Sequence, residues 1–103
     1  MTSTSDERYM LRALDVARAA QAEGEPPFGA IVVNRAGEIV AEASDEVRRG
    51  RDFSLHAEVN VVRRACQRLG PELRGCTLYT NIEPCPMCFT AAWLAHVAGI
   101  VFG

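Results

Sequence analysis

Residues 76–94 have the sequence CTLYTNIEPCPMCFTAAWL, in which a predicted strand leads into a predicted helix. The strand covers 76–81 and the helix runs from Pro84 to about Ala95. A C-x-x-C pair, Cys85 and Cys88, stands where that helix begins. Residues three apart lie next to each other on one face of a helical turn. The sequence therefore predicts two adjacent thiols at a strand-to-helix junction, a pattern typical of metal or redox sites.

A second motif, His56-Ala57-Glu58, begins another predicted helix, which runs to Leu69. Each motif is weak by itself, because H-x-E and C-x-x-C both occur by chance, and a single histidine near a helix start is usually a surface or core residue. Both motifs, however, stand at helix N-termini that follow a strand or a loop. In a layered sheet such helix ends gather along one edge. Together the two motifs predict one site.

The residue types of this predicted site suit zinc. His56, Cys85 and Cys88 offer the nitrogen and sulfur ligands that zinc prefers, and three protein ligands leave the fourth position to water, as in catalytic sites. A helix N-terminus also lowers the pKa of a thiol. Glu58, beside the open position, would then move a proton between water and a substrate.

The two remaining cysteines are not expected to be ligands. Cys66 lies in the second predicted helix, roughly 15 Å along the axis from His56. Cys76 begins the strand 76–81, at the end away from the site. Both are interpreted as small buried hydrophobic residues.

The rest of the chain predicts an α/β layered fold, because strands alternate with helices. We expect helices over about 5–22, 56–69 and 84–95, and strands over 28–33, 38–43, 76–81 and 99–102. The strand 28–33 is apolar throughout and should be buried on both faces. The half-polar strand 38–43 should be its antiparallel neighbour at an edge.

Local expectations concern residues 44–69. Residues 44–54 should form a solvated loop, although the arginines within 48–51 leave a phosphate or polynucleotide contact open. Ser54 is a suitable N-cap for the following helix. Its apolar face is predicted to contain Val59, Val62, Ala65 and Leu69.

Composition excludes several classes of protein. The 103 residues suffice for one domain, and a charged fraction of 23% argues against disorder. A net charge of −2 argues against a dedicated basic surface for nucleic acid. No apolar run reaches the roughly 20 residues of a membrane span, so no membrane partner is expected. The polar N-terminus is unlike a secretory signal, so we expect a cytoplasmic protein whose cysteines are not disulfides.

With these residues in view, the chain resembles the zinc-dependent cytidine/deoxycytidylate deaminase superfamily over about residues 8–103. His56-Ala57-Glu58 and Pro84-Cys85-Pro86-Met87-Cys88 carry the resemblance. The run Pro27-Phe28-Gly29-Ala30, with Glu83-Pro84-Cys85, is most similar to the guanine deaminase and tRNA adenosine deaminase branch. The resemblance implies a three-layer α/β/α fold around a mixed sheet with strand order 2-1-3-4.

The resemblance also implies roles for individual residues. His56, Cys85 and Cys88 would bind Zn²⁺, Glu58 would be the proton shuttle, and the Ala57 N–H would contact the substrate. The implied reaction is hydrolytic deamination of a nucleobase or nucleoside, in which zinc hydroxide attacks the amine-bearing ring carbon and ammonia leaves. Guanine or a related base is favoured over the alternative, tRNA wobble adenosine. Phe28 and Glu83 are further candidate substrate contacts, and a homodimer is expected.

Asp45 is a departure from the family, which commonly has asparagine eleven residues before the zinc histidine. An amide donates and accepts hydrogen bonds, whereas an ionised carboxylate only accepts them. If Asp45 faces the site, it should therefore favour a substrate that presents an N–H group. The alternative is that the loop register differs and Asp45 is solvated.

Length is the other departure. Family members typically continue with another helix, a fifth strand and a C-terminal helix. We therefore expect residues 1–103 to form a single zinc-dependent deaminase domain that is incomplete at the C-terminus. An inactive, deaminase-like zinc-binding domain remains the non-enzyme alternative.

Overall fold

The computed structural model describes residues 4–103. Its helices are α1 (Thr4–Ala22), α2 (Val47–Gly50), α3 (Ala57–Leu69) and α4 (Pro86–Leu94). Its strands are β1 (Gly29–Val33), β2 (Ile39–Ser44), β3 (Thr77–Thr80) and β4 (Gly99–Phe102). Every element expected from the sequence is present, with slightly different ends. The helix α2 is an addition.

The strands form one mixed sheet in the order β2-β1-β3-β4, as expected. β1 is antiparallel to both of its neighbours, β2 and β3, whereas β4 is parallel to β3. All five residues of β1 are buried, which explains its uninterrupted apolar sequence. β2 lies at an edge and is only partly buried, in keeping with its half-polar sequence.

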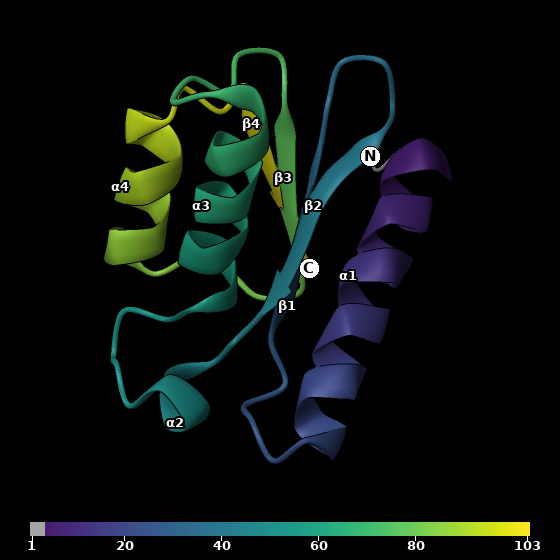
Figure 1. Ribbon diagram of the computed structural model, residues 1–103. Coiled ribbons are helices and arrows are strands. Elements are labelled where there is room, and N and C mark those ends of the chain that lie inside the picture. Colours follow the sequence, from purple (N-terminus) through teal and green to yellow (C-terminus); the bar gives the residue numbers. More distant parts are fainter. Residues whose placement is uncertain (1–3) are drawn as a thin grey trace.

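Helices cover both faces of this sheet (Figure 1), so the three-layer α/β/α architecture is confirmed. On one face, Tyr9 of α1 packs with Ile31 and Tyr79. On the other face, α3 and α4 cover a larger core that includes Val32 and Leu78. The layers approach closely at the start of β1.

Gly29 permits that close approach of α1 to β1. A Cβ atom added at this position would lie 2.5 Å from the Ala13 carbonyl oxygen, well inside van der Waals contact. A residue with a side chain would therefore push α1 away from the sheet. The glycine of the Pro27–Ala30 run thus has a packing role.

Three local expectations were wrong. Ser54 is not the N-cap of α3, because the helix begins at Ala57 with His56 in the capping position. The Ser54 hydroxyl instead donates to Asp52 Oδ1 at 2.7 Å. Val59 and Leu69 lie outside the buried face of α3. The helix contacts both the sheet and α4, so the side that it buries differs from the predicted apolar side. The buried residues of α3 are Ala57, Glu58, Asn60, Val61, Val62 and Ala65.

The third error concerns residues 44–54, which are not a plain solvated loop but contain α2. Of the arginines there, Arg49 forms ion pairs with Glu23 at 3.0 Å and Glu46 at 3.3 Å. Its charge is therefore already paired with carboxylates. Within residues 4–103, no helix has both the length and the apolar character needed to cross a bilayer.

Candidate metal and catalytic site

The two sequence motifs meet at the N-termini of α3 and α4. His56 is the N-cap residue of α3 and Cys85 is the N-cap residue of α4, and neither makes a side-chain capping hydrogen bond. Pro86 follows in the first turn of α4, where its missing N–H costs nothing. The fold therefore aims the imidazole and the thiols at each other rather than at the helix ends they begin.

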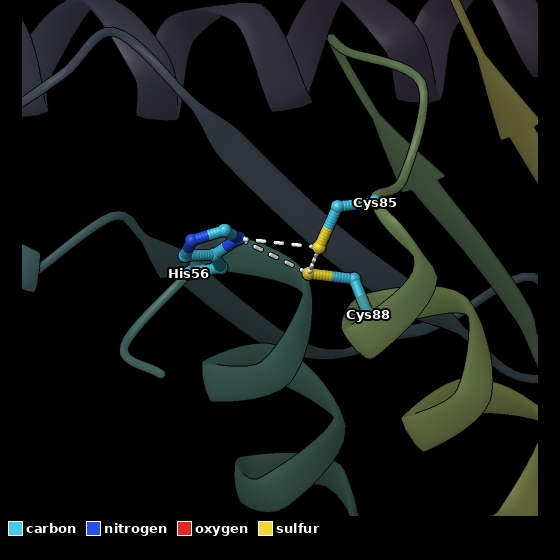
Figure 2. A group of neighbouring side chains, drawn as sticks. All are labelled: His56, Cys85 and Cys88. Carbon is cyan, nitrogen blue, oxygen red and sulfur yellow. Dashed lines mark hydrogen bonds between the residues drawn. The ribbon is translucent and has the colours of Figure 1, made fainter. Parts of the chain in front are cut away.

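His56, Cys85 and Cys88 form a compact cluster (Figure 2). The Sγ atoms of the two cysteines are 3.3 Å apart. The His56 Nδ1 atom lies 3.3 Å from the Cys88 sulfur and 3.6 Å from the Cys85 sulfur. Tetrahedral zinc, with bonds of about 2.3 Å to sulfur and about 2.0 Å to nitrogen, separates its ligand atoms by roughly 3.5–3.8 Å. The three donors therefore fit zinc after shifts of a few tenths of an ångström.

Cys88 is fully buried, whereas Cys85 and His56 are partly exposed. Burial raises the pKa of the Cys88 thiol, and the neighbouring Cys85 and Glu58 add to this shift. A buried thiolate therefore needs a compensating positive charge, which a divalent cation among these three atoms would provide. The donor set thus matches a cation chemically as well as geometrically.

The other two cysteines lie outside this cluster. Cys76 is buried and Cys66 is partly buried, and burial raises the pKa of both thiols. Among the described residues, no fourth histidine, cysteine or carboxylate joins the group. A metal held here would keep one coordination position for a non-protein ligand.

Glu58 lies beside the cluster, in the first turn of α3, and only 3% of its surface is exposed. Burial raises the pKa of its carboxyl group. Hydrogen bonds from its own backbone N–H and from the Cys88 thiol, together with the charge of His56, oppose this shift. The structure thus brings the expected proton carrier next to the expected metal ligands.

Asp45 is buried, with 4% of its surface exposed, so of the two alternatives left open by the sequence, a solvated Asp45 is the one that does not hold. Its Oδ1 atom accepts a hydrogen bond from the Val47 N–H at 2.9 Å. Its negative charge acts in the same direction as burial and raises the pKa of Glu58. Asp45 therefore belongs to the same electrostatic environment as Glu58.

The other candidate substrate contacts differ in position. Ala57 is fully buried and begins α3, where first-turn N–H groups have no partner within the helix. Phe28 is partly buried, and its carbonyl oxygen accepts the Asp45 N–H at 3.1 Å. Glu83 is exposed and lies at the rim of an open groove of about 410 Å³ between α4 and β4. No residue of the metal cluster lines that groove.

Sequence reasoning missed two polar side chains that hold the loops around the site. The Asn60 amide donates to the carbonyl oxygens of Ser44 at 3.0 Å and Leu55 at 3.2 Å, the residues that precede Asp45 and His56. The Asn81 side chain accepts the Gly29 N–H at 2.8 Å and donates to the Pro27 carbonyl at 3.0 Å. No sequence signal marks these asparagines, because Asn60 reaches Ser44, and Asn81 reaches Pro27 and Gly29, across long separations along the chain.

The sequence also matches a known family. The family model for the cytidine and deoxycytidylate deaminase zinc-binding region matches residues 3–103. The chain belongs to this deaminase family. Zinc is accordingly the metal that the family and the donor atoms both indicate for the cluster of His56, Cys85 and Cys88.

Relatives of this deaminase-family chain include both members of the expected branch. It is 44% identical over 101 residues to the tRNA-specific adenosine deaminase of Bacillus subtilis, covering 97% of this chain. The solved structure of guanine deaminase from Bacillus subtilis matches 94% of this chain with a TM-score of 0.90 and 38% identity. That of guanine deaminase from Nitrosomonas europaea matches all of it with a TM-score of 0.90 and 29% identity.

These relatives are longer than the chain. It spans 62% of the Bacillus subtilis tRNA deaminase, 62% of the guanine deaminase from the same organism and 59% of the one from Nitrosomonas europaea. The likeness covers the two motifs and the sheet that supports them.

Proposed function

We propose that this chain catalyses zinc-dependent hydrolytic deamination of a nucleobase or nucleoside, with guanine as the favoured substrate. The observation that carries the proposal is the buried Glu58 carboxylate beside a cluster of three zinc-type donors. A site with only three protein ligands and a neighbouring proton carrier suits hydrolysis, whereas a structural zinc site uses four protein ligands.

The chemistry divides between metal and protein. When bound by His56, Cys85 and Cys88, zinc supplies Lewis-acid activation of water near neutral pH. Glu58 takes a proton from the attacking water and passes it to the ring nitrogen next to the reacting carbon. Glu58 then transfers the second proton of the water to the amine, which leaves as ammonia, and the ring keeps a carbonyl group. Burial of Glu58 favours this role, since it raises the pKa of the carboxyl group toward the working pH.

Substrate selection is assigned to the residues around the cluster. The Ala57 N–H donates to a substrate carbonyl oxygen or ring nitrogen. Asp45, which as a carboxylate only accepts hydrogen bonds, favours a base edge that presents N–H groups, as guanine does. Phe28 packs against the ring, and Glu83, two residues before Cys85, contacts the substrate from the loop that precedes α4. The likeness to two guanine deaminase structures supports the choice of guanine.

Ammonia release from a panel of guanine, cytosine, adenosine and tRNA, with zinc content measured on the same samples, tests this proposal. We expect release from guanine at about one zinc per chain and little from the other three substrates. Bound zinc without ammonia release from any substrate would overturn the proposal and favour an inactive zinc-binding domain.

A second candidate is deamination of tRNA wobble adenosine, which the 44% identity to a tRNA-specific adenosine deaminase favours. It requires contacts to RNA phosphates, for which Arg48 and Arg51 near the site are the candidate residues. Binding of tRNA that weakens steeply with salt, together with inosine formation, would favour this activity. Salt-independent release of ammonia from free guanine would favour the first one.

We further propose that the working form is a cytoplasmic homodimer. The exposed aromatic side chains Phe89 and Trp93 of α4, with Phe102 of β4, support a subunit interface there. A reducing compartment suits the zinc-binding thiols. Sedimentation that gives a monomer at all micromolar concentrations would refute the dimer. Cell fractionation, which shows the compartment that contains the protein, tests the cytoplasmic location.

A further inference from the structure

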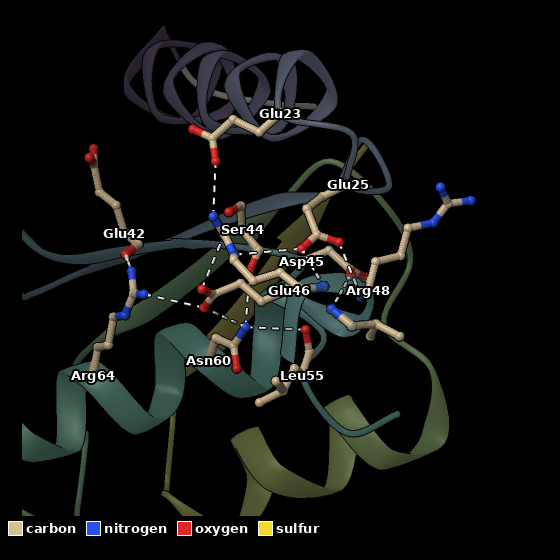
Figure 3. Close-up of polar contacts among 12 residues, drawn as sticks. Glu23, Glu25, Glu42, Ser44, Asp45, Glu46, Arg48, Leu55, Asn60 and Arg64 are labelled. Carbon is tan, nitrogen blue, oxygen red and sulfur yellow. Dashed lines mark hydrogen bonds and ion pairs between the residues drawn. The ribbon is translucent and has the colours of Figure 1, made fainter. Parts of the chain in front are cut away.

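Glu25 is a buried carboxylate that the proposed mechanism does not use. It lies in the segment between α1 and β1, and 6% of its surface is exposed. Its Oε1 atom accepts the Arg48 N–H at 3.1 Å, and its Oε2 atom accepts the Arg49 N–H at 3.0 Å (Figure 3). The Arg49 Nε atom lies 3.6 Å from the same Oε2 atom. Glu25 thus binds α2 through two backbone groups and one charge.

Asp45 binds the same helix. Its Oδ1 atom accepts the Val47 N–H at 2.9 Å. The Val47 amide therefore donates to Asp45, and the amides of Arg48 and Arg49 donate to Glu25. α2 has only four residues and none of them is buried. A single helical turn without a packed face is not stable by itself. Its place in the fold therefore depends on these carboxylates.

Asp45 connects α2 to the site. Its backbone N–H donates to the Phe28 carbonyl oxygen at 3.1 Å. The Asn60 amide also ties Ser44, the residue before Asp45, to Leu55, the residue before His56. If α2 moves, the Val47 N–H moves with it, and the Asp45 carboxylate loses the hydrogen bond that orients it. A displacement at α2 would therefore change what a substrate beside Glu58 meets.

We propose that Glu25 is a positioning residue: by fixing α2 it orients the Asp45 carboxylate toward the site. The positional part stands on the contacts alone, whereas its effect on catalysis rests on the proposed deaminase function. The side-chain hydrogen bonds and the ion pair of Glu25 that the described part of the chain contains go to Arg48 and Arg49, so it acts through α2 and Asp45.

Glu23 provides a matched control. It binds the same arginine, with Arg49 Nη1 at 3.0 Å from its Oε2 atom, but 59% of its side chain is exposed. An exposed ion pair contributes little to stability, whereas removing the charge of a buried, hydrogen-bonded carboxylate is costly. Glu23→Gln removes a carboxylate charge that pairs with Arg49 but leaves the hydrogen bonds of the α2 amides in place. Glu25→Gln disturbs those hydrogen bonds.

Hydrogen exchange of the backbone amides in the whole chain tests the positional part. In Glu25→Gln we expect Val47, Arg48 and Arg49 to exchange about tenfold to a hundredfold faster, because charge-assisted hydrogen bonds are lost. In Glu23→Gln the same amides should stay within about twofold of the wild-type rate. Unchanged exchange at Val47 in Glu25→Gln would overturn the proposal, since Glu25 would then not act on the hydrogen bond of Asp45.

A reciprocal variant keeps the test decisive if Glu25→Gln does not fold. Asp45→Ala removes the acceptor of the Val47 N–H, and coupling between the two carboxylates must act in both directions. We then expect faster exchange at Arg48 and Arg49 as well. Wild-type protection of these two amides in Asp45→Ala would overturn the coupling.

A double-mutant cycle on deamination of guanine tests the catalytic part. Glu25→Gln should lower kcat/KM about tenfold in the wild-type chain and less than about twofold in the Asp45→Asn background. Independent losses that simply multiply would overturn the link through Asp45. If no version of the chain releases ammonia, the proposed function fails while the exchange measurements still decide the positioning role.

Discussion

The buried carboxylate of Asp45 acts on the buried carboxylate of Glu58: burial is the main cause that raises the pKa of Glu58, and the charge of Asp45 acts in the same direction. The two residues come from different elements, Asp45 from the loop that follows β2 and Glu58 from the first turn of α3. This relationship joins the residue proposed to select the substrate to the residue proposed to carry the proton.

Asp45→Asn should shift the pH dependence of deamination. Glu58 must be ionised to accept a proton from water, so its pKa sets the acid limb of the kcat/KM profile. Loss of the Asp45 charge lowers the pKa of Glu58, and the acid limb moves to lower pH. A bound zinc ion affects both proteins alike, so the profiles are compared at equal zinc content. An acid limb at the wild-type pH would contradict this link.

The same substitution should also change the choice of substrate. An amide both donates and accepts, so Asp45→Asn should tolerate bases that present a ring lone pair where guanine presents an N–H. We expect kcat/KM for guanine to fall by about tenfold relative to cytosine and adenosine. The relative rates on these three substrates provide the measurement, and an unchanged order and ratio would remove Asp45 from substrate selection.

His56→Asn should lose zinc and stability together, because metal binding energy is part of the folding energy of such a site. The chain has one other histidine, His96, which is exposed and has a φ angle of 60°. His96→Asn makes the same change there, at a backbone conformation that asparagine tolerates. Zinc content and the melting temperature are measured on both variants. Equal zinc in His56→Asn and His96→Asn would exclude His56 as a ligand.

Tyr79 makes the fold sensitive to alkaline pH. Its pKa is raised by burial and by the hydrogen bond from its hydroxyl group to Asp6. The fold thus favours the neutral phenol, and this stabilisation is complete below the unfolded pKa of about 10. It falls above that pH by up to about 1.4 kcal/mol per pH unit.

Tyr79→Phe should remove this part of the pH dependence, and Tyr9→Phe should keep it. The measurement is the free energy of unfolding between about pH 9 and pH 11. Parallel curves for the wild type and Tyr79→Phe would show that the Tyr79 hydroxyl does not contribute.

Local sequence predicted most of the fold. β1 was recognisable because it is apolar at every position, and α4 because Pro86 and the cysteine pair mark its start. The first turn of α3 was misjudged at Ser54, since the chain uses the N-cap position for His56 instead. α2 could not be predicted, because its amides depend on Glu25, a residue more than twenty positions earlier in the chain.

The candidate site was also predictable only where its residues form a local sequence pattern. His56, Glu58, Cys85 and Cys88 stand in two short motifs whose spacing carries chemistry. Their loop supports, such as Asn60, act across long sequence separations and have no local pattern. The burial of Asp45 was likewise a question that only packing could answer.

Glu58→Gln provides the most direct test of the central claim. The amide keeps the size of the side chain but cannot accept the proton of the attacking water. We predict that the variant keeps about one zinc per chain and releases ammonia from guanine about 10²–10⁴-fold more slowly than the wild type. Ammonia release at the wild-type rate from the zinc-loaded variant would contradict the account.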